Sequence, residues 1–360
     1  MATTAFGVNH PLARKLWSEK LFREALKETW IGRFIGTSNS SVIQMLTDTQ
    51  KAAGDSIHVG LRVQLTGAGI AGDSTLEGNE EALTFYRDTV TINQLRHAVR
   101  SEGKASEQRV PYSMREEARA GLADWLSGRL DESFFNQVCG NTGQGDTRYT
   151  GMQATVAPTA TATAADGINR IIVGGSHDAE GSLSATTTHA IALRDLDVAV
   201  ARAKTMSPMI RPLRVGGESR YVAFLHPYQI YQLRGQTSTA QWADIQKAVL
   251  TGGDIKDNPI FTGAAGMYNG VVIHEAVRIP NTTGMAANAA YRRGVFCGAQ
   301  SAAVAFGQGG SINRVDWNEE LFDYGNQLGV GAGLIWGMKK LQFNSTDFGT
   351  IALAGYAPAP

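Results

Sequence analysis

Residues Ser113–Gly140 read SMREEARAGLADWLSGRLDESFFNQVCG, and this stretch predicts the longest helix of the chain. Ser113 and Glu116 have capping-box spacing at its start, and Gly140 is placed to end it. At about 1.5 Å per residue the helix would be roughly 40 Å long. Apolar side chains recur in it at every fourth position: Met114, Ala118, Leu122, Leu126, Leu130, Phe134 and Val138. Because such a stripe drifts around the helix axis, we expect the two ends to contact different neighbours.

Charged side chains occupy other positions of the predicted helix and indicate a solvent-exposed outer face: Arg115, Glu116, Arg119, Asp124, Arg129 and Asp131. The adjacent carboxylates of Asp131 and Glu132 face different ways around a helix. We therefore interpret both as solvated charges and not as a catalytic pair.

Upstream of this helix, two extended segments flank a long polar loop. Apolar and polar residues alternate strictly over residues 57–65, which is strand periodicity. A second extended segment runs from Phe85 to Leu95, and residues 66–81 between the two are rich in Gly, Thr, Asp and Glu. The loop has too few large apolar residues to form a core. The sequence therefore predicts a hairpin that protrudes from the body of the protein.

Downstream of residue 140, shorter elements of both kinds are expected. The predicted helices span residues 193–205, 228–233 and 242–250. The predicted strands span residues 221–225, 271–273 and 294–297, then lie near Val315 and at residues 341–343 and 351–353. Segment 328–338 is apolar and rich in glycine, and its pattern leaves helix and strand both open.

The first forty residues are expected to form an arm. Apolar residues recur at helical spacing between Leu12 and Ile31, and bases fill much of the other face. This strongly amphipathic helix needs a partner surface, which is either the protein's own domain or another subunit. The residues expected to make the arm's contacts are Leu16, Trp17, Leu21 and Phe22.

The composition excludes several classes of function. Acidic and basic residues balance at 33 each, so we expect no strong global attraction to nucleic acid or to a membrane surface. No apolar run approaches the ~20 residues that a membrane helix needs. The N-terminus lacks a signal-peptide layout. Cys139 and Cys297 have no ligand-like spacing and are interpreted as reduced thiols of a cytoplasmic protein.

Two motifs resemble a nucleotide-binding site and a zinc site, but the residues around them do not fit either one. Gly67–Gly72 has the glycine spacing of a dinucleotide-binding loop, but acidic and polar residues and another strand follow it where a helix must begin. His274-Glu275 opens like a zinc-protease motif, yet Arg278 stands where the second ligand belongs. We therefore expect no catalytic residues, no metal and no cofactor. A nucleotide-binding enzyme that uses the Gly67–Gly72 loop stays the alternative.

Local charge is uneven although the net charge is zero, and three groups of charged residues are candidate contacts. Acids gather at the predicted loop tip: Asp73, Glu77, Glu80 and Glu81. Bases gather after it: Arg96, Arg100, Arg115 and Arg119. A second group of bases lies within residues 202–220: Arg202, Lys204, Arg211 and Arg214. Such asymmetry suits docking between identical copies, and an ordinary solvated surface is the other interpretation.

The order of these features, together with several short stretches, resembles the major capsid proteins of tailed bacteriophages, and within them a podovirus-type coat family. The fold also forms the floor of herpesvirus shells. The stretches that carry the resemblance are Ala5–Pro11, Thr66–Gly69, Leu76–Glu80, Leu95–Arg100, Tyr268–Val271 and Asp323–Asn326. They span nearly the whole chain, but none is a catalytic signature.

The resemblance implies an α+β fold with named parts. These are an N-terminal arm (1–40), an extended β-hairpin loop region (41–97), a peripheral domain with a spine helix (98–140), an axial domain (141–308) and C-terminal strands of the peripheral domain (309–360). It implies self-assembly into hexamers and pentamers of an icosahedral head around double-stranded DNA. The implied partners are portal, scaffold and decoration proteins, with weak DNA contact through residues 202–220 or the arm, and the implied location is the virion. Another phage structural protein, from a tail or a decoration layer, is the third interpretation.

Overall fold

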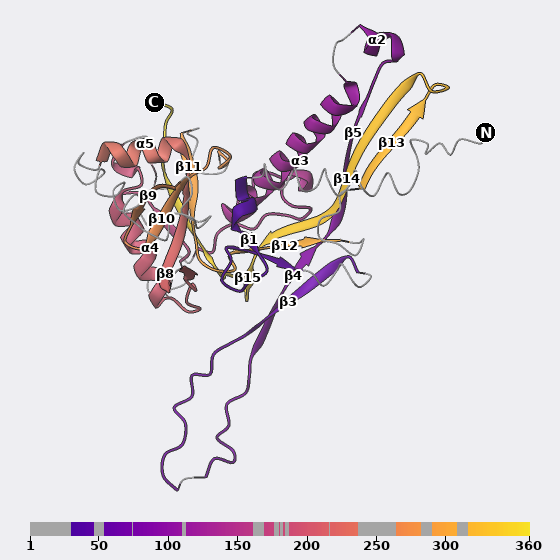
Figure 1. Ribbon diagram of the computed structural model, residues 1–360. Helices are drawn as coiled ribbons and strands as arrows, with labels where there is room; N and C mark the ends of the chain where they lie inside the picture. The colour runs from indigo at the N-terminus through magenta and orange to yellow at the C-terminus, as the bar shows by residue number, and fades with distance from the viewer. Residues whose placement is uncertain are drawn as a thin grey trace.

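The computed structural model has three parts: a body that contains the long helix, a second lobe, and a hairpin that projects from between them (Figure 1). The structure describes residues 30–46, 54–73, 75–109, 113–160, 169–175, 180, 183, 187–215, 217–236, 264–281, 290–307 and 316–360. The expected arm helix and the expected helix at 242–250 lie outside these residues, except that the arm's end at Trp30–Phe34 forms a 3₁₀ helix, η1.

The first part, which we call the α3 body, is built on a six-stranded sheet. Its strand order is β1–β2–β12–β14–β13, and β5 pairs with the opposite edge of β14. The strands are β1 (Ile35–Gly36), β2 (Ile43–Leu46), β5 (Asn93–Arg100), β12 (Ala302–Phe306), β13 (Asp316–Phe322) and β14 (Gln327–Lys340). A short helix α2 (Lys104–Gln108) follows β5 at the end far from the second lobe (Figure 1).

Helix α3 (Met114–Val138) packs on one face of this sheet and confirms the predicted helix. The Glu116 amide donates to Ser113 Oγ at 3.4 Å, so the predicted N-cap is confirmed. Gly140 has φ +64° directly after the C-cap residue Cys139, a left-handed conformation that glycine adopts without strain. From Ala118 to Val138 every member of the four-residue stripe is buried.

Segment 328–338, which the sequence left open, is a strand. Its glycines alternate with larger residues, so they gather on one face of β14 while the other face is buried in the core with α3. The buried residues of that second face are Val330, Ala332, Leu334, Trp336 and Met338. Glycine recurs at every second position because alternate side chains of a strand point to opposite faces, and only one face of β14 packs against α3.

The second part, which we call the seven-stranded lobe, holds another mixed sheet. Its order is β6–β17–β11–β8–β10–β9, with β7 paired to β8. The strands are β6 (Ile171–Val173), β7 (Leu213–Val215), β8 (Glu218–Leu225), β9 (Ala264–Tyr268), β10 (Val271–Glu275), β11 (Tyr291–Cys297) and β17 (Thr350–Tyr356). Its helices are α4 (Leu193–Thr205), α5 (Pro227–Gln236) and the 3₁₀ turn η6 (Thr187–His189). A further 3₁₀ turn, η3 (Thr147–Tyr149), packs on α3. The predicted elements within the described residues are confirmed, and Leu196, Val200 and Ala203 of α4 are buried as predicted.

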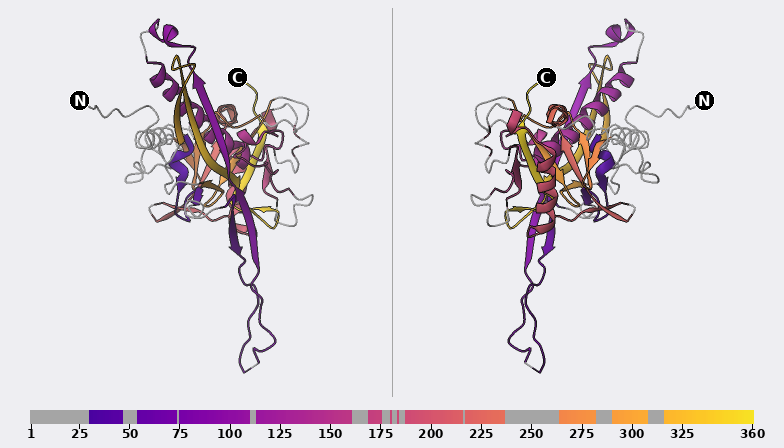
Figure 2. Two further views of the ribbon diagram at one scale, coloured as in Figure 1. Left: turned by 90° about the vertical axis from the view of Figure 1, so that its right-hand side faces the viewer. Right: turned by 90° about the vertical axis from the view of Figure 1, so that its left-hand side faces the viewer.

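The third part, which we call the projecting hairpin, pairs β3 (Ser56–Arg62) with β4 (Phe85–Thr91). The described residues between the two strands form no helix or strand and extend far from the body (Figures 1 and 2). The predicted protruding hairpin is confirmed. Its expected second strand was too long, however, because Leu95 belongs to β5 and pairs with Leu334 of the six-stranded sheet.

Asp131 corrects the predicted outer face of the long helix, because its side chain is buried. Its carboxylate accepts hydrogen bonds from the backbone amides of Trp30 at 3.2 Å and Ile31 at 3.1 Å, and Arg278 Nε lies 3.9 Å from it. Burial raises the pKa of this carboxyl, while the two amide bonds act in the opposite direction. The end of the arm covers the helix at this turn, which helical periodicity alone does not reveal.

Two consecutive lysines at the end of β14 connect the three parts. Lys339 Nζ pairs with Asp88 of β4 and so holds the projecting hairpin. Lys340 Nζ lies 2.8 Å from Asp347 Oδ1, and both of these side chains are 1% exposed. Asp347 ends the small β15–β16 turn (Gln342–Phe343 and Thr346–Asp347), from which the chain enters β17 of the seven-stranded lobe.

Leu126→Ala is expected to lower the free energy of unfolding by about 2–5 kcal/mol, because truncating a core leucine leaves a cavity. Leu126 is 2% exposed, whereas the control residue Leu321 is 49% exposed. Chemical denaturation compares the two alanine variants. An unchanged midpoint for Leu126→Ala would refute its place in the core.

Lys340→Met is expected to destabilise the protein by about 3–5 kcal/mol, because it leaves the Asp347 carboxylate buried without its cation. The double variant Lys340→Met with Asp347→Asn should recover part of this loss, since the unpaired carboxylate is removed. The recovery is incomplete because the buried Arg170 guanidinium loses its nearby carboxylate. Denaturation of the two single variants and the double variant measures the coupling. Additive losses would show that the two side chains do not interact.

Candidate assembly surfaces

The four acids predicted at the tip of the projecting hairpin fall into two groups: Glu80 and Glu81 accept hydrogen bonds within the loop, and the other two do not. Glu81 accepts hydrogen bonds from the amides of Thr66, at 2.9 Å, and Gly67, at 2.7 Å, and so closes the base of the loop. Glu80 accepts from the Gly78 amide at 2.8 Å. Asp73 and Glu77 are exposed and make no hydrogen bond or ion pair with another described residue. These two carboxylates are therefore the ones available for a contact outside the loop.

The same hydrogen bonds show whether Gly67–Gly72 can act as a nucleotide-binding loop. A nucleotide loop needs free amides at the start of a helix. Here a carboxylate of the chain itself occupies the amides of Thr66 and Gly67, and no helix occurs in the described part of the loop. The nucleotide-binding alternative finds no support in this geometry.

Large apolar side chains are exposed along the projecting hairpin. Leu65 is 52% exposed, Leu76 61%, Leu83 51% and Phe85 64%. An isolated exposed leucine needs no explanation, but several on one projection without a core indicate a surface that another molecule covers. The contacts predicted from the sequence for this loop were its charged residues alone. The exposed apolar residues were visible in the sequence as a minority among polar neighbours.

The four bases predicted as one patch lie on two faces of the six-stranded sheet. Arg115 and Arg119 belong to α3, where Arg115 pairs with Glu319 of β13. Arg96 and Arg100 lie on β5, and Arg96 contacts the glycine-lined face at Gly333. The Arg100 guanidinium stacks on the Phe322 ring at 4.2 Å and bonds Gln327. The structure therefore keeps Arg96 and Arg100 together on one exposed face and separates them from the α3 pair.

Strand register brings charged residues of β5 and β13 to opposite sides of the β14 glycines on this face, an arrangement that the sequence did not predict. Three ranks cross β5, β14 and β13 in order: Arg96, Gly333 and Asp316; Ala98, Gly331 and Asn318; Arg100, Gly329 and Glu320. The glycines lie in the middle, where the side chains of Arg96 and Phe322 cover Gly333 and Gly329, with the two arginines on one side and the two acids on the other. The patch is thus bipolar. The period-two glycines were the available signal, but the acids opposite them could be found only from the register.

The bases of residues 202–220 are divided in a similar way. The Arg202 guanidinium donates to the Ile171 carbonyl at 2.8 Å, and that of Arg211 donates to Gln300 at 3.3 Å. Lys204 and Arg214 are exposed. Two of the four predicted DNA-facing residues are thus committed at least partly to bonds within the fold.

The predicted arm contacts Leu16, Trp17, Leu21 and Phe22 lie outside the described residues, but the arm's end is anchored firmly. The Trp30 ring lies 5.7 Å from Phe135 of α3 and 5.5 Å from Phe224 of β8, centroid to centroid. Phe34 lies 5.2 Å from the His274 ring of β10. This aromatic cluster joins the arm, α3 and the seven-stranded lobe.

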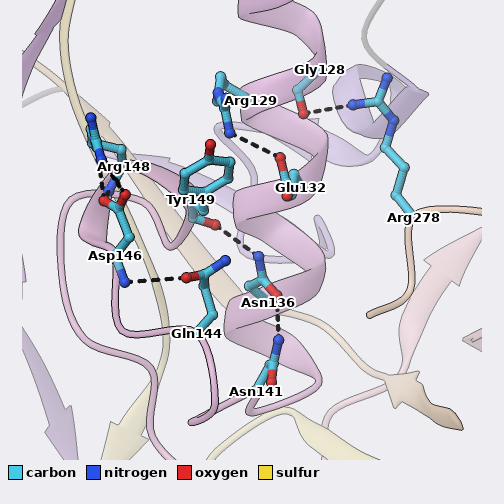
Figure 3. A network of polar contacts seen from close by, with 10 residues as sticks. All are labelled: Gly128, Arg129, Glu132, Asn136, Asn141, Gln144, Asp146, Arg148, Tyr149 and Arg278. Atoms are coloured by element: carbon cyan, nitrogen blue, oxygen red, sulfur yellow. Dashed lines mark hydrogen bonds and ion pairs between the residues drawn. The ribbon is translucent and has the colours of Figure 1, made fainter. Parts of the chain in front are cut away.

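A polar network fixes the chain that leaves α3 (Figure 3). Arg129 pairs with Glu132 at 3.2 Å and stacks on the Tyr149 ring at 3.7 Å. Asn136 donates to the Tyr149 carbonyl at 2.9 Å. From the other lobe, Arg278 donates to the Gly128 carbonyl at 2.6 Å. These contacts make the helix a shared support for both lobes.

Within the described residues, no three His, Cys, Asp or Glu side chains gather as a metal-binding group would. Nor is any described helix both long enough and apolar enough to cross a bilayer.

Comparison with known proteins identifies this arrangement as the fold of phage capsid proteins. The capsid of Ralstonia phage GP4 superposes with a TM-score of 0.80 and 32% identity, over 100% of this chain and 99% of that one. The Cyanophage Pam1 capsid gives a TM-score of 0.73 and 23% identity, over 100% of each chain. The major capsid protein of Pseudomonas phage KPP25 is 30% identical over 369 residues, covering 94% of this chain and 93% of the relative.

A family model described as phage capsid protein matches residues 5–359. The chain belongs to the phage capsid protein family, and its role is structural. The predicted α+β capsid fold is confirmed.

The loop base is expected to open in acid. The Thr66 and Gly67 amides hold the pKa of Glu81 below its ordinary value of 4.5. Because the pKa of Glu81 is lower in the folded protein, the loop base is closed above the ordinary value of 4.5 and opens as the pH falls through the lowered pKa. The NMR shift of the Gly67 amide should titrate with a midpoint below 4.5.

Glu81→Gln should abolish this titration, and the matched variant Glu77→Gln should leave it intact. A Gly67 amide that titrates equally in all three proteins would show that Glu81 does not close the loop.

Proposed function

We propose that this chain is the major capsid protein that self-assembles into hexamers and pentamers of an icosahedral head around double-stranded DNA. The observation that carries the proposal is the projecting hairpin, with its exposed leucines, Phe85, and the free carboxylates of Asp73 and Glu77. A projection without a core adds interface area only if a neighbouring subunit covers it.

The described parts suit the domain boundaries that we propose. The arm would span 1–40, the extended loop region 41–97, the peripheral domain 98–140 with the C-terminal strands 309–360, and the axial domain 141–308. The α3 body would correspond to the peripheral domain, although β1, β2, β12 and the first part of β5 come from outside these ranges. The seven-stranded lobe corresponds to the axial domain, although its strand β17 comes from the C-terminal segment.

Loop docking is proposed to pair opposite charges between copies. Asp73 and Glu77 at the tip of one copy would meet Arg96 and Arg100 on strand β5 of a neighbour. Only these loop acids lack a described partner, and these two bases share one exposed face. Opposite charges at such a contact guide the register of docking more than they raise affinity.

Further partners are proposed from the class of protein. Portal, scaffold and decoration proteins would bind the assembled shell. Contact with packaged DNA would use Lys204 and Arg214, the exposed bases of residues 202–220, with Arg202 and Arg211 contributing less. With no net charge on the chain, this contact would be weak and would fall steeply with salt.

The double variant Asp73→Lys with Glu77→Lys is expected to impair shell formation without changing the melting temperature, because neither side chain bonds to another described residue. Electron microscopy and sedimentation of the variant and the wild-type protein measure the yield of closed shells. Glu117→Lys with Asp124→Lys, on the exposed face of α3, is the control with the same change in charge.

Adding Arg96→Glu to the loop variant should restore part of the yield if the two sites meet. Normal shells from the loop variant would refute the docking. Wild-type protein that forms no shells under any condition would refute the proposed function itself.

A further inference from the structure

The side chains of Lys340 and Asp347 meet inside the protein, where water does not reach them. Lys340 Nζ lies 2.8 Å from Asp347 Oδ1, and each side chain is 1% exposed. The preceding lysine of the same strand differs, because the side chain of Lys339 is 18% exposed beside Asp88. The Lys340 pair therefore holds an amine and a carboxyl group in contact without solvent between them.

Burial makes the amine of Lys340 a better nucleophile. It lowers the pKa of Lys340 because the charged form is penalised inside the protein, while the Asp347 carboxylate acts in the opposite direction. A lysine desolvated in this way is more often the neutral amine, which is the form that attacks a carbonyl carbon. Transfer of one proton from Nζ to Oδ1 yields the neutral amine and a neutral carboxylic acid together.

The groups around Asp347 are placed to assist an attack on its carboxyl carbon. The Thr159 amide donates to Oδ2 at 3.1 Å, the oxygen on which negative charge develops when the carbon becomes tetrahedral. The side-chain amide of Gln342 donates to Oδ1 at 2.6 Å, and this is the oxygen that would leave. The buried Arg170 guanidinium adds positive charge near the same carboxyl group.

We propose that Lys340 and Asp347 condense into an amide bond within the chain, with the loss of one water molecule. Nζ attacks Cγ of Asp347, so the Nζ–Cγ bond forms and the Cγ–Oδ1 bond breaks. Two protons of the ammonium group leave with Oδ1 as water, the third stays on the amide nitrogen, and Oδ2 becomes the amide oxygen. The reaction needs no oxidant and no co-reactant. The fold supplies the high effective concentration of the two groups.

The bond closes a ring through the β15–β16 turn. Lys340 is the last residue of β14, and Asp347 ends β16 shortly before the chain enters β17. A covalent link at this place joins a strand of the α3 body to the segment that leads into the seven-stranded lobe. The bond forms within one chain, so it does not depend on the assembly proposed above.

The test is the mass of the purified full-length chain, denatured after increasing times of storage in the folded state and then digested with trypsin. The chain should become lighter by one water molecule. Because no lysine or arginine follows Lys340, trypsin releases residues 341–360 from an unlinked chain. The linked chain should resist cleavage after Lys340 and release residues 340–360, lighter by one water. Lys339 and Asp88 are the control pair in the same molecule and should stay unlinked, because water reaches Lys339.

Two variants separate the roles of the amine and of the donor to Oδ1. Lys340→Arg keeps the charge but replaces the amine by a guanidinium, which stays protonated and does not attack, so its mass should equal that of its sequence. Gln342→Met removes the hydrogen bond to Oδ1 and should slow the loss of water. The measurement on the wild-type chain needs neither variant to fold.

An unchanged mass after prolonged storage, with residues 341–360 released by trypsin, would overturn the amide bond. Loss of water within residues 341–360, with cleavage after Lys340 intact, would also overturn it, because that result marks a cyclic imide formed at an aspartate. Either result leaves the proposed function intact.

Discussion

Two consecutive lysines on β14 each form an ion pair with a carboxylate of another segment. Successive side chains of a strand point to opposite faces, so Lys339 reaches Asp88 of the projecting hairpin while Lys340 reaches Asp347 before β17. A buried charge is costly unless it is paired and hydrogen-bonded. The two ion pairs therefore favour the arrangement in which β4 of the hairpin and the β15–β16 turn both lie against the end of β14.

A second constraint joins the arm to the same frame. The carboxylate of Asp131 accepts the amides of Trp30 and Ile31, and the Trp30 ring packs between α3 and the seven-stranded lobe. The largest buried cluster of the described residues thus joins the arm's end, α3 and strands of both large sheets. The extremities, which are the loop tip and the β13–β14 turn, contain exposed side chains and little core. A rigid centre with exposed extremities suits a subunit that contacts several copies of itself.

The Gly67–Gly72 loop resembles a nucleotide-binding loop in sequence, but its amides stabilise the loop itself. Backbone amides of a glycine-rich turn bind an anion readily, and a nucleotide-binding protein leaves them open for phosphate. In this chain Glu81 supplies the anion from the other side of the loop, so the amides stabilise the loop itself. The Thr66 and Gly67 amides thus have their acceptor within the chain.

The sequence by itself determined the elements whose pattern is local. The N-cap at Ser113, the four-residue stripe of α3, the alternating strand of the hairpin and its polar loop all follow from spacing along the chain, and the stretches that resemble tailed-phage capsid proteins led to the family. Only the tertiary structure decided which charges are available for contacts. Asp131 is buried because residues 30 and 31 lie over it, and Arg96 faces Asp316 across Gly333 because three distant strands share a register. In both cases the partner comes from a remote part of the chain, so spacing along the sequence does not reveal which charges are paired.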